Sequence, residues 1–271
     1  MNKVGIGLRK EFAEEFADGN YLNVDFVEFA PENWMNIGGY WKKVIDKIAE
    51  KYPIYCHGLS LSIGSPEELD WEFLKQVKQF LNQYNIPIYS EHLSYSKAAN
   101  AHLYDLLPMP FRKDAVKHIV QRINQVQDFL ERELTLEIVS YYTPVEAQMS
   151  EIEFINSIAQ ESKCKLLLDV NNVYVNSFNH QYDAKAFINA LPLQQVEYVH
   201  MAGHEQVSPD LIIDTHGEPI VDKVYDLFEH TIPLLKNVPV LLERDFNIPD
   251  AEELQLEIDK LKSICAKLVI C

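Results

Sequence analysis

The sequence is poor in the features that mark several large classes of protein. It has 4 cysteines in 271 residues, none in a Cys-x-x-Cys pair, which excludes a disulfide framework and a zinc knuckle. No apolar run approaches the roughly 18 residues that a membrane-spanning helix needs. Lysine and arginine number 24 against 41 acidic residues, and the net charge of −17 disfavours nucleic acid and anionic membranes as partners.

Targeting and linker segments are missing as well. Residues 1–20 lack the apolar run and cleavage site of a signal peptide, so we expect a cytoplasmic protein with reduced thiols. Cys271, the last residue, is expected to be a tail thiol without a role. No linker or low-complexity tract divides the chain, so residues 1–271 are predicted to form one domain.

Short apolar runs alternate with amphipathic stretches along the chain. The runs predict strands at 4–8, 24–32, 54–62, 86–94, 134–140, 165–172, 196–203 and 239–245. The stretches predict helices at 9–17, 39–51, 67–84, 111–132, 150–161, 183–190, 218–236 and 251–267. Ser65-Pro66-Glu67 and Ser150-Glu151 are interpreted as helix N-caps. Eight strands alternating with eight helices predict an α/β fold, a single (β/α)₈ TIM barrel.

Three long connections follow predicted strands, at 95–110, 173–182 and 203–217. In a barrel they would all lie at the catalytic end, where the strands have their carboxyl ends. Connections of this length are usually functional, and we expect 95–110 to be a lid.

Strand alternation predicts a ring of polar residues at the same end of the barrel. Strands three to eight each place one histidine or carboxylate on the inward face: His57, His92, Glu137, Asp169, His200 and Glu243. The segment "DTHG" adds Asp214 and His216 after strand seven. Strand two offers Glu28 and Glu32, followed by Asn33, which we expect to contact substrate.

These residues together predict a metal centre. Buried carboxylates without basic partners are costly, and the one basic residue found nearby, Arg244, is predicted to point to the opposite face. Four carboxylates and four imidazoles exceed what one ion accepts, so we predict two or three ions with Glu137 as the bridge. Imidazole and carboxylate without thiolate suit iron, manganese or zinc.

The remaining histidines receive simpler interpretations. His102 lies in the predicted lid and is expected to reach substrate. His204 follows strand seven and is expected to support a ligand or face substrate. His118, His180 and His230 are expected at the surface.

Eight segments, in barrel order, resemble the DUF692 family, also called UPF0276. They are "HGLSLSIGS", "SEHLSY", "DLLPMPF", "LEIVSYY", "LLLDVNNVYVN", "HMAGH", "DTHG" and "LLERD", and the resemblance spans roughly residues 4–245. It implies a xylose-isomerase-like barrel that holds two or three non-heme irons, mixed ferrous and ferric, with dioxygen as co-substrate. It implies an iron-dependent oxidoreductase that modifies cysteines of a ribosomally synthesised precursor peptide, by oxazolone and thioamide formation or related chemistry. A partner protein that recognises the precursor is implied as well.

Carried onto the matching positions, the resemblance also implies the ligand set. The metal ligands would be His57, His92, Glu137, Asp169, Asn172, His200, Asp214, His216 and Glu243. Among them, Glu137, Asp169, His200 and Glu243 are expected to take part in catalysis.

Three alternatives stay open at the level of sequence. A sugar isomerase or epimerase uses the same barrel, but often with a lysine at a strand end, and no inward strand end here carries one. An endonuclease IV-like hydrolase has a similar ligand set, but the net charge of −17 weighs against DNA. A metal-storing or scaffolding protein without catalysis is the third.

Overall fold

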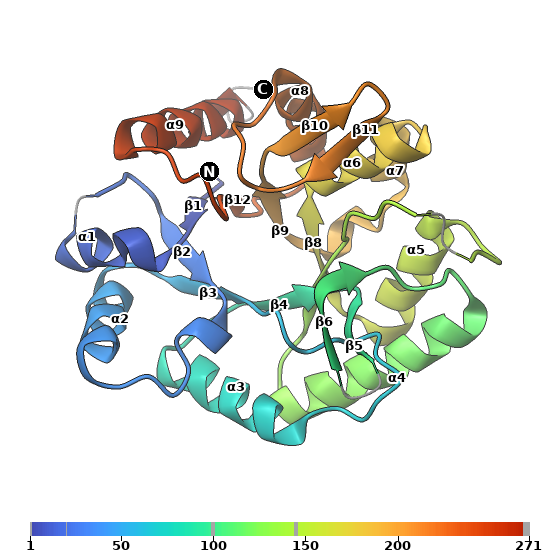
Figure 1. Cartoon of the computed structure of the whole chain (residues 1–271), viewed down its shortest axis with the longest axis horizontal. Coiled ribbons are helices and arrows are strands. Elements are labelled where there is room, and N and C mark those ends of the chain that lie inside the picture. The colour runs from blue at the N-terminus through green and yellow to red at the C-terminus, as the bar shows by residue number, and fades with distance from the viewer. Residues whose placement is uncertain (1, 20, 99–100, 144–145, 268–271) are drawn as a thin grey trace.

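The computed structural model describes residues 2–19, 21–98, 101–143 and 146–267, and it contains a closed parallel barrel. The barrel strands follow chain order, and the last pairs with the first to close the ring (Figure 1). They are β1 (Val4–Gly7), β2 (Phe26–Phe29), β3 (Ile54–His57), β4 (Tyr89–His92), β7 (Thr135–Glu137), β8 (Lys165–Asp169), β9 (Val196–Met201) and β12 (Val240–Leu242). Each lies within one of the eight predicted strands, and the predicted TIM barrel is confirmed.

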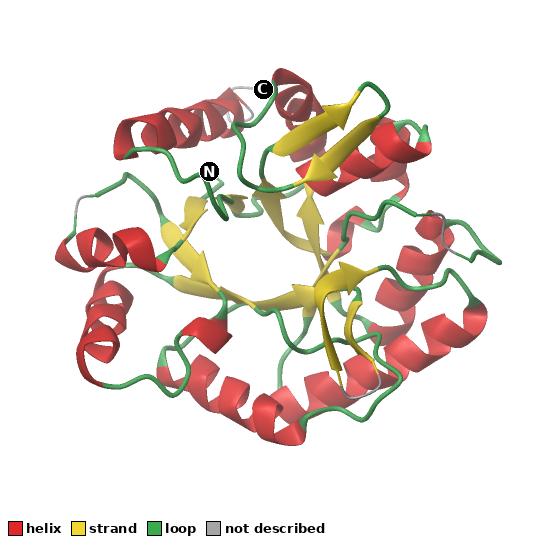
Figure 2. Ribbon diagram, viewed as in Figure 1, coloured by secondary structure: helices red, strands yellow, loops and turns green. Residues whose placement is uncertain are grey.

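Helices surround the strand ring on its outside (Figure 2). They are α1 (Ala13–Asp18), α2 (Gly39–Lys51), α3 (Trp71–Gln83), α4 (Lys113–Leu130), α5 (Glu151–Ser162), α6 (Val170–His180), α7 (Ala184–Ala190), α8 (Asp222–Thr231) and α9 (Ala251–Lys267). Short 3₁₀ helices lie at η1 (Lys10–Phe12), η2 (Pro31–Asn33), η3 (Leu193–Gln195) and η4 (Ile232–Leu234). None of the helices in the described part of the chain combines the length and hydropathy needed to cross a bilayer.

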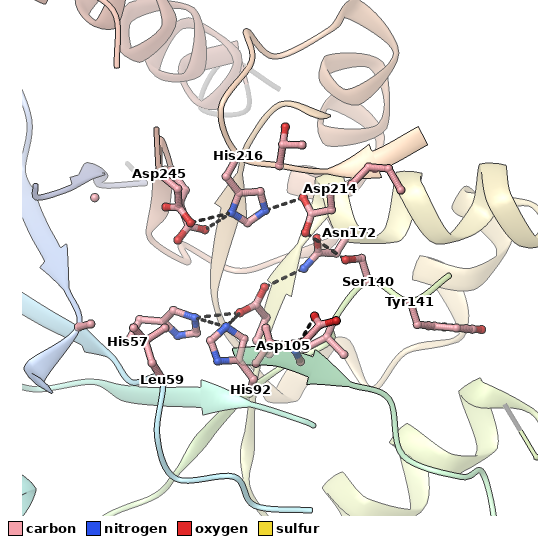
Figure 3. A pocket seen from close by; sticks show the side chains of 18 of the residues that line it. His57, Leu59, His92, Asp105, Ser140, Tyr141, Asn172, Asp214, His216 and Asp245 are labelled. Carbon is pink, nitrogen blue, oxygen red and sulfur yellow. Dashed lines mark hydrogen bonds and ion pairs between the residues drawn. The ribbon is translucent and has the colours of Figure 1, made fainter. Parts of the chain in front are cut away.

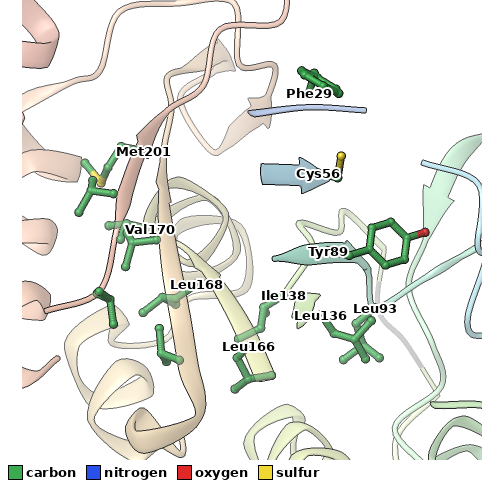
Figure 4. Packing of buried hydrophobic residues seen from close by; sticks show 14 of the residues in the cluster. Phe29, Cys56, Tyr89, Leu93, Leu136, Ile138, Leu166, Leu168, Val170 and Met201 are labelled. Atoms are coloured by element: carbon green, nitrogen blue, oxygen red, sulfur yellow. The ribbon is translucent and has the colours of Figure 1, made fainter. Parts of the chain in front are cut away.

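Strand alternation divides the apolar residues into two sets. Outward side chains such as Leu136, Leu166 and Leu168 pack under the helices in one large core (Figure 4). A second, smaller cluster fills the barrel: Phe26, Tyr55, Ile88, Leu167, Tyr198 and Leu241. Glu28 follows Phe26, and His200 follows Tyr198, on the inward faces of their strands. These polar residues therefore lie above the apolar cluster that fills the barrel.

The helix N-cap predicted at Ser150 is confirmed, whereas the one at Ser65 is wrong. Ser150 forms a capping box with Glu153 at the start of α5. Helix α3 instead begins at Trp71, because the Asp70 side chain accepts the Phe73 amide at 2.9 Å. Arg122 on α4 has a buried guanidinium that donates to the carbonyls of Ser62, Ile63 and Glu67. These bonds hold the loop before α3 in a non-helical conformation.

The long connections also differ from simple loops. Residues 173–182, expected to be a connection, are largely helical, because α6 begins at Val170 directly after β8. The two others form antiparallel hairpins, β5 (Tyr95–Ala98) with β6 (Ala101–Leu107), and β10 (His204–Ser208) with β11 (Leu211–Asp214). Both hairpins lie at the end of the barrel where the strands have their carboxyl ends (Figure 1).

Candidate metal centre

Parallel pairing brings the predicted ligands side by side at the carboxyl ends of the strands. His92 on β4 is directly opposite Glu137 on β7. Asp169 on β8 is opposite His200 on β9. The predicted ligands thus come from neighbouring strands, and their side chains point into the barrel above its apolar floor.

Three overlapping groups of histidine and carboxylate could each hold a metal ion. They are His57–His92–Glu137, Glu137–Asp169–His200 and Asp169–His216–Glu243, and in each the ligand atoms lie within 4.8 Å of one another. Glu137 and Asp169 each belong to two groups. The arrangement therefore supports neighbouring ions that share carboxylates.

The first group is the tightest. The Glu137 Oε2 atom lies 2.9 Å from His57 Nε2 and 3.3 Å from His92 Nε2, and the two Nε2 atoms are 3.1 Å apart (Figure 3). Three ligand atoms thus point at one small volume. The Asn172 amide donates to the other Glu137 oxygen, Oε1, at 2.8 Å and fixes the carboxylate plane.

His200 lies between two carboxylates at the centre of the site. Its Nε2 is 2.9 Å from Glu28 Oε1, and its Nδ1 is 2.8 Å from Glu243 Oε2. Glu28 was not among the predicted ligands, although it is only 2 % exposed and lies in the cluster. Its inward position after Phe26 on β2 is the signal that could have identified it.

His216 completes the cluster from the loop after β11. Its Nε2 is 2.8 Å from Asp214 and 3.5 Å from Asp169, and its Nδ1 is 3.2 Å from Glu243. The residue has a φ of 51°, and its backbone is fixed by bonds to Gly203 and Asp245. Tertiary bonds thus hold this histidine in a strained conformation that turns its ring toward the ligands.

At the start of α6, the two asparagines after Asp169 point to different partners. Asp169 caps α6 because its Oδ1 accepts the backbone N–H of Asn172 at 2.8 Å. Its other oxygen, Oδ2, faces the cluster. Asn172 faces Glu137, as expected of a residue in the centre. Asn171 instead donates to Asp214 Oδ1 at 2.8 Å and contacts His204 Nδ1 at 2.7 Å.

Charges in the cluster are compensated in the metal-free protein by protons. Burial opposes ionisation of Glu137, but His92 and His57 outweigh it and lower the pKa of Glu137 to about 2. Burial raises the pKa of Asp169 to about 8 against the attraction of His216, with Glu137 and Asp214 adding to the rise. Burial lowers the pKa of His200, but Glu28 and Glu243 reverse this and raise it well above its usual value. Asp169 and His200 therefore hold protons at neutral pH where cations could bind, whereas Glu137 is ionised.

The cluster forms the floor of a cavity of about 720 Å³. Among the described residues that line it, Arg9 is the one lysine or arginine. Its guanidinium pairs with Asp245, donates to the Arg244 carbonyl and lies 3.9 Å from Glu243 Oε1. Arg244 does point to the outer face, where it pairs with Glu257, but the expectation that no other basic residue is near was wrong. Arg9 lies two residues beyond β1, outside the strand pattern that we used.

The three expected substrate-binding residues have different positions. Asn33 is exposed on η2 and does not line the cavity, because the chain turns away from the barrel mouth after Ala30. His204 is buried, stacks on Tyr174 and bonds to Asn171, so it supports Asp214 from behind. His102 lies on β6, and its side chain is outside the described part of the structure.

The remaining described histidines and cysteines lie outside the three ligand groups. His118, His180 and His230, expected at the surface, are only partly exposed, and each makes a hydrogen bond. Cys56, Cys164 and Cys265 are buried free thiols. Cys271 lies outside the described residues.

The donor set fits bound metal ions. Two buried oxygens in the cluster, Asp169 Oδ2 and Asn172 Oδ1, make no hydrogen bond among the described residues, and His216 Nε2 and Glu243 Oε2 have ion-pair contacts without good hydrogen-bond geometry. Buried polar atoms are rarely left without a partner, and a cation would satisfy all of these. Mixed imidazole and carboxylate ligands are typical of non-heme iron, manganese and zinc sites.

The fold is that of a xylose-isomerase-like TIM barrel. A xylose isomerase-like TIM barrel protein from Mycobacterium smegmatis, in complex with magnesium, superposes with a TM-score of 0.62 at 10% identity, covering 95% of this chain and 89% of that chain. Endonuclease IV from Thermus thermophilus superposes with a TM-score of 0.64 at 14% identity, covering 96% of this chain and 99% of that chain. At these identities the likeness establishes the fold alone.

Sequence comparison gives the family. Residues 3–266 match the family model described as RiPP precursor modification enzyme MbnB/TglH/ChrH, and the chain belongs to this family. UPF0276 proteins from Shewanella loihica and Acinetobacter baylyi are 51% and 50% identical to it. Each alignment covers 96% of this chain, and 93% and 90% of the relative. The resemblance inferred from the sequence segments is thereby confirmed.

Proposed function

We propose that this protein is a multinuclear non-heme iron enzyme that uses dioxygen to modify cysteine residues of a ribosomally synthesised precursor peptide. The observation that carries the proposal is the set of three overlapping histidine and carboxylate groups on the cavity floor. Family membership supports a precursor peptide as the substrate. A partner protein that presents the peptide is part of the proposal.

The protein residues would divide the work of holding the metal. His57 and His92 would serve one ion, His200 a second, and His216 and Glu243 a third, with Glu137 shared by the first two groups and Asp169 by the last two. Bound iron would supply a binding site for the cysteine thiolate and the electrons that reduce dioxygen.

The cavity above the metal ligands suits a peptide segment. Leu107, Pro108 and Ile213 contribute apolar wall from the connections after β4 and β9, and this wall would keep bulk water from the reacting side chain. Leu59, Tyr142 and Phe246 line the same cavity and are each at least 41 % exposed, on three different loops. These three would contact the residues that flank the cysteine.

Asp245 and Arg9 extend the site toward solvent. Arg9 neutralises the outermost carboxylates, Asp245 and Glu243. A peptide that enters the cavity mouth would therefore contact an ion pair rather than unpaired carboxylates. No lysine lines the described part of the cavity, which argues against the sugar isomerase alternative with a strand-end lysine.

The decisive experiment combines metal content with turnover. Protein from iron-rich growth, purified without chelator, is expected to contain two or more irons per chain, partly ferric by Mössbauer spectroscopy. Given a cysteine-containing precursor peptide encoded near its gene, it should consume dioxygen and change the peptide mass. The same peptide with serine in place of cysteine is the control.

The outcomes separate the alternatives. Stoichiometric zinc or manganese without iron, even from iron-rich growth, would favour a hydrolase or an isomerase. Two or more irons without any change in cysteine peptides would leave the metal centre in place and refute the proposed reaction.

A further inference from the structure

A chain of buried hydrogen bonds lies beneath the metal centre. His57 Nδ1 is 2.8 Å from Ser90 Oγ, and Ser90 Oγ is in a short hydrogen bond with the Tyr198 hydroxyl. Ser90 and Tyr198 are both 0 % exposed. They come from β4 and β9, which are not neighbours in the barrel, so the bond spans its interior.

Glu28 lies at the far end of this chain. The Tyr198 hydroxyl also hydrogen-bonds to the Glu28 carboxylate. Glu28 Oε1 is also 2.9 Å from His200 Nε2. The chain therefore begins at a histidine of the first ligand group and ends at a carboxylate that contacts a histidine of the second.

The charge of Glu28 gives the chain a direction. It attracts the Tyr198 O–H proton, which leaves the Tyr198 oxygen free to accept from Ser90. Ser90 Oγ then accepts from the N–H at His57 Nδ1. The other orientation of the Ser90 hydroxyl, toward the Cys56 carbonyl at 3.3 Å, is the longer of its contacts.

We infer that Ser90 and Tyr198 are positioning residues that hold His57 as its Nδ1–H tautomer and so present Nε2 to the metal. A metal-bound histidine commonly donates its second ring N–H to a partner, which fixes the ring orientation and raises its basicity. The inference rests on the metal site of the proposed function and is independent of the peptide chemistry.

Packing alone does not explain a tyrosine at this position. Its neighbours inside the barrel are mostly apolar, and the ring of Tyr55 packs edge-on against it at 5.9 Å. A phenylalanine would fill the same space without a buried hydroxyl, which is destabilising when it has no hydrogen-bond partner. The hydroxyl is therefore retained for its link to Ser90.

The test is an anaerobic titration of the metal-free protein with cobalt(II), followed through its visible absorption bands. Tyr198→Phe and Ser90→Ala are expected to weaken one bound cobalt roughly 10- to 100-fold and to change its bands. Tyr55→Phe is the matched control, because it removes a hydroxyl from the same layer but not from the chain. The double variant should lose no more than the stronger single variant.

Melting curves of the metal-free variants exclude misfolding as the cause. If Ser90→Ala fails to fold, Tyr198→Phe decides the question alone. A Tyr198→Phe protein that binds cobalt with wild-type affinity and wild-type bands would overturn the inference. Wild-type protein that binds neither cobalt nor iron would instead refute the metal centre itself.

Discussion

At the scale of single residues, Glu137 holds the centre of the site. One of its oxygens faces His57 and His92, and the other accepts from Asn172. It is shared by two of the three ligand groups. Removing its charge should therefore disturb more than one ion.

We predict that Glu137→Gln lowers metal content by more than one ion per chain. The loss of affinity should exceed the roughly 10- to 100-fold that is typical of residues around a metal shell. Elemental analysis after growth in iron measures it. Asp105→Asn, which changes an exposed cavity acid outside the ligand groups, should keep the wild-type content. Equal metal content in the two variants would contradict a bridging role.

At the scale of elements, the first turn of α5 buries a carboxyl group. Glu151 accepts a hydrogen bond from the Tyr141 hydroxyl at 3.1 Å. Burial raises the pKa of Glu151 to about 7, against the opposing effect of this bond. The folded state thus binds a proton more tightly than the unfolded state, and the associated stability is lost as pH rises.

We predict that the free energy of unfolding of the wild type, relative to Glu151→Gln, falls by about 2 kcal/mol between pH 5 and pH 8. The rise in the pKa of Glu151 from 4.5 to about 7 sets the upper limit of this change in free energy. The positive end of the α5 dipole favours the ionised carboxylate and makes the change smaller. Urea denaturation of both proteins in chelator measures the difference. The same change at the exposed Glu161, on the same helix, should show no such trend. If the free energy of unfolding of the wild type instead rose with pH relative to Glu151→Gln, the predicted direction would be wrong.

Several α6 side chains contact the β10–β11 hairpin, and Asn179 is the one that bonds to the hairpin backbone at Ile212. The Asn179 amide donates to the Ile212 carbonyl at 2.8 Å and accepts the Ile212 N–H at 3.1 Å. The same hairpin ends at Asp214, which contacts His216. The hairpin and the proposed metal ligand His216 are therefore linked through a short stretch of chain.

We predict that Asn179→Ala speeds amide hydrogen exchange in residues 204–214 by roughly 5- to 30-fold, which corresponds to the loss of two hydrogen bonds of about 0.5–1 kcal/mol each. Mass spectrometry of peptides from this region measures it. Asn189→Ala, which removes a surface hydrogen bond to His230, is the control. Unchanged hydrogen exchange in the hairpin would show that the two Asn179 hydrogen bonds do not stabilise it.

At the scale of the whole molecule, the metal centre bears on stability. The chain has a net charge of −17, and its buried carboxylates converge on one end of the barrel. Cations that bind only the folded state shift the folding equilibrium toward it.

We predict that each bound iron, at a free concentration 100-fold above its dissociation constant, raises the melting temperature by about 5–10 °C. The stabilisation is about 2.7 kcal/mol per site, and each kcal/mol corresponds to about 2–4 °C at this size. Anaerobic calorimetry with and without iron measures the shift. Glu137→Gln should show a smaller shift, and equal shifts in both proteins would place the stabilising ion elsewhere.

The sequence by itself determined the barrel and most of the histidines and carboxylates that gather at its mouth. Alternation within each strand is a property of a few consecutive residues, so it assigned His57, Glu137 and Glu243 to the inward face without knowledge of their neighbours. The chain order of the strands then required their ends to meet at one mouth.

Only the tertiary structure decided which other groups join them. Arg9 follows a strand end and Asn171 lies in a helical turn, and each meets its partner across 30 or more residues of chain. The loop before α3 is likewise held by Arg122, far along the sequence. Local periodicity carries no information on such contacts, because they depend on the distance between segments that only folding brings together.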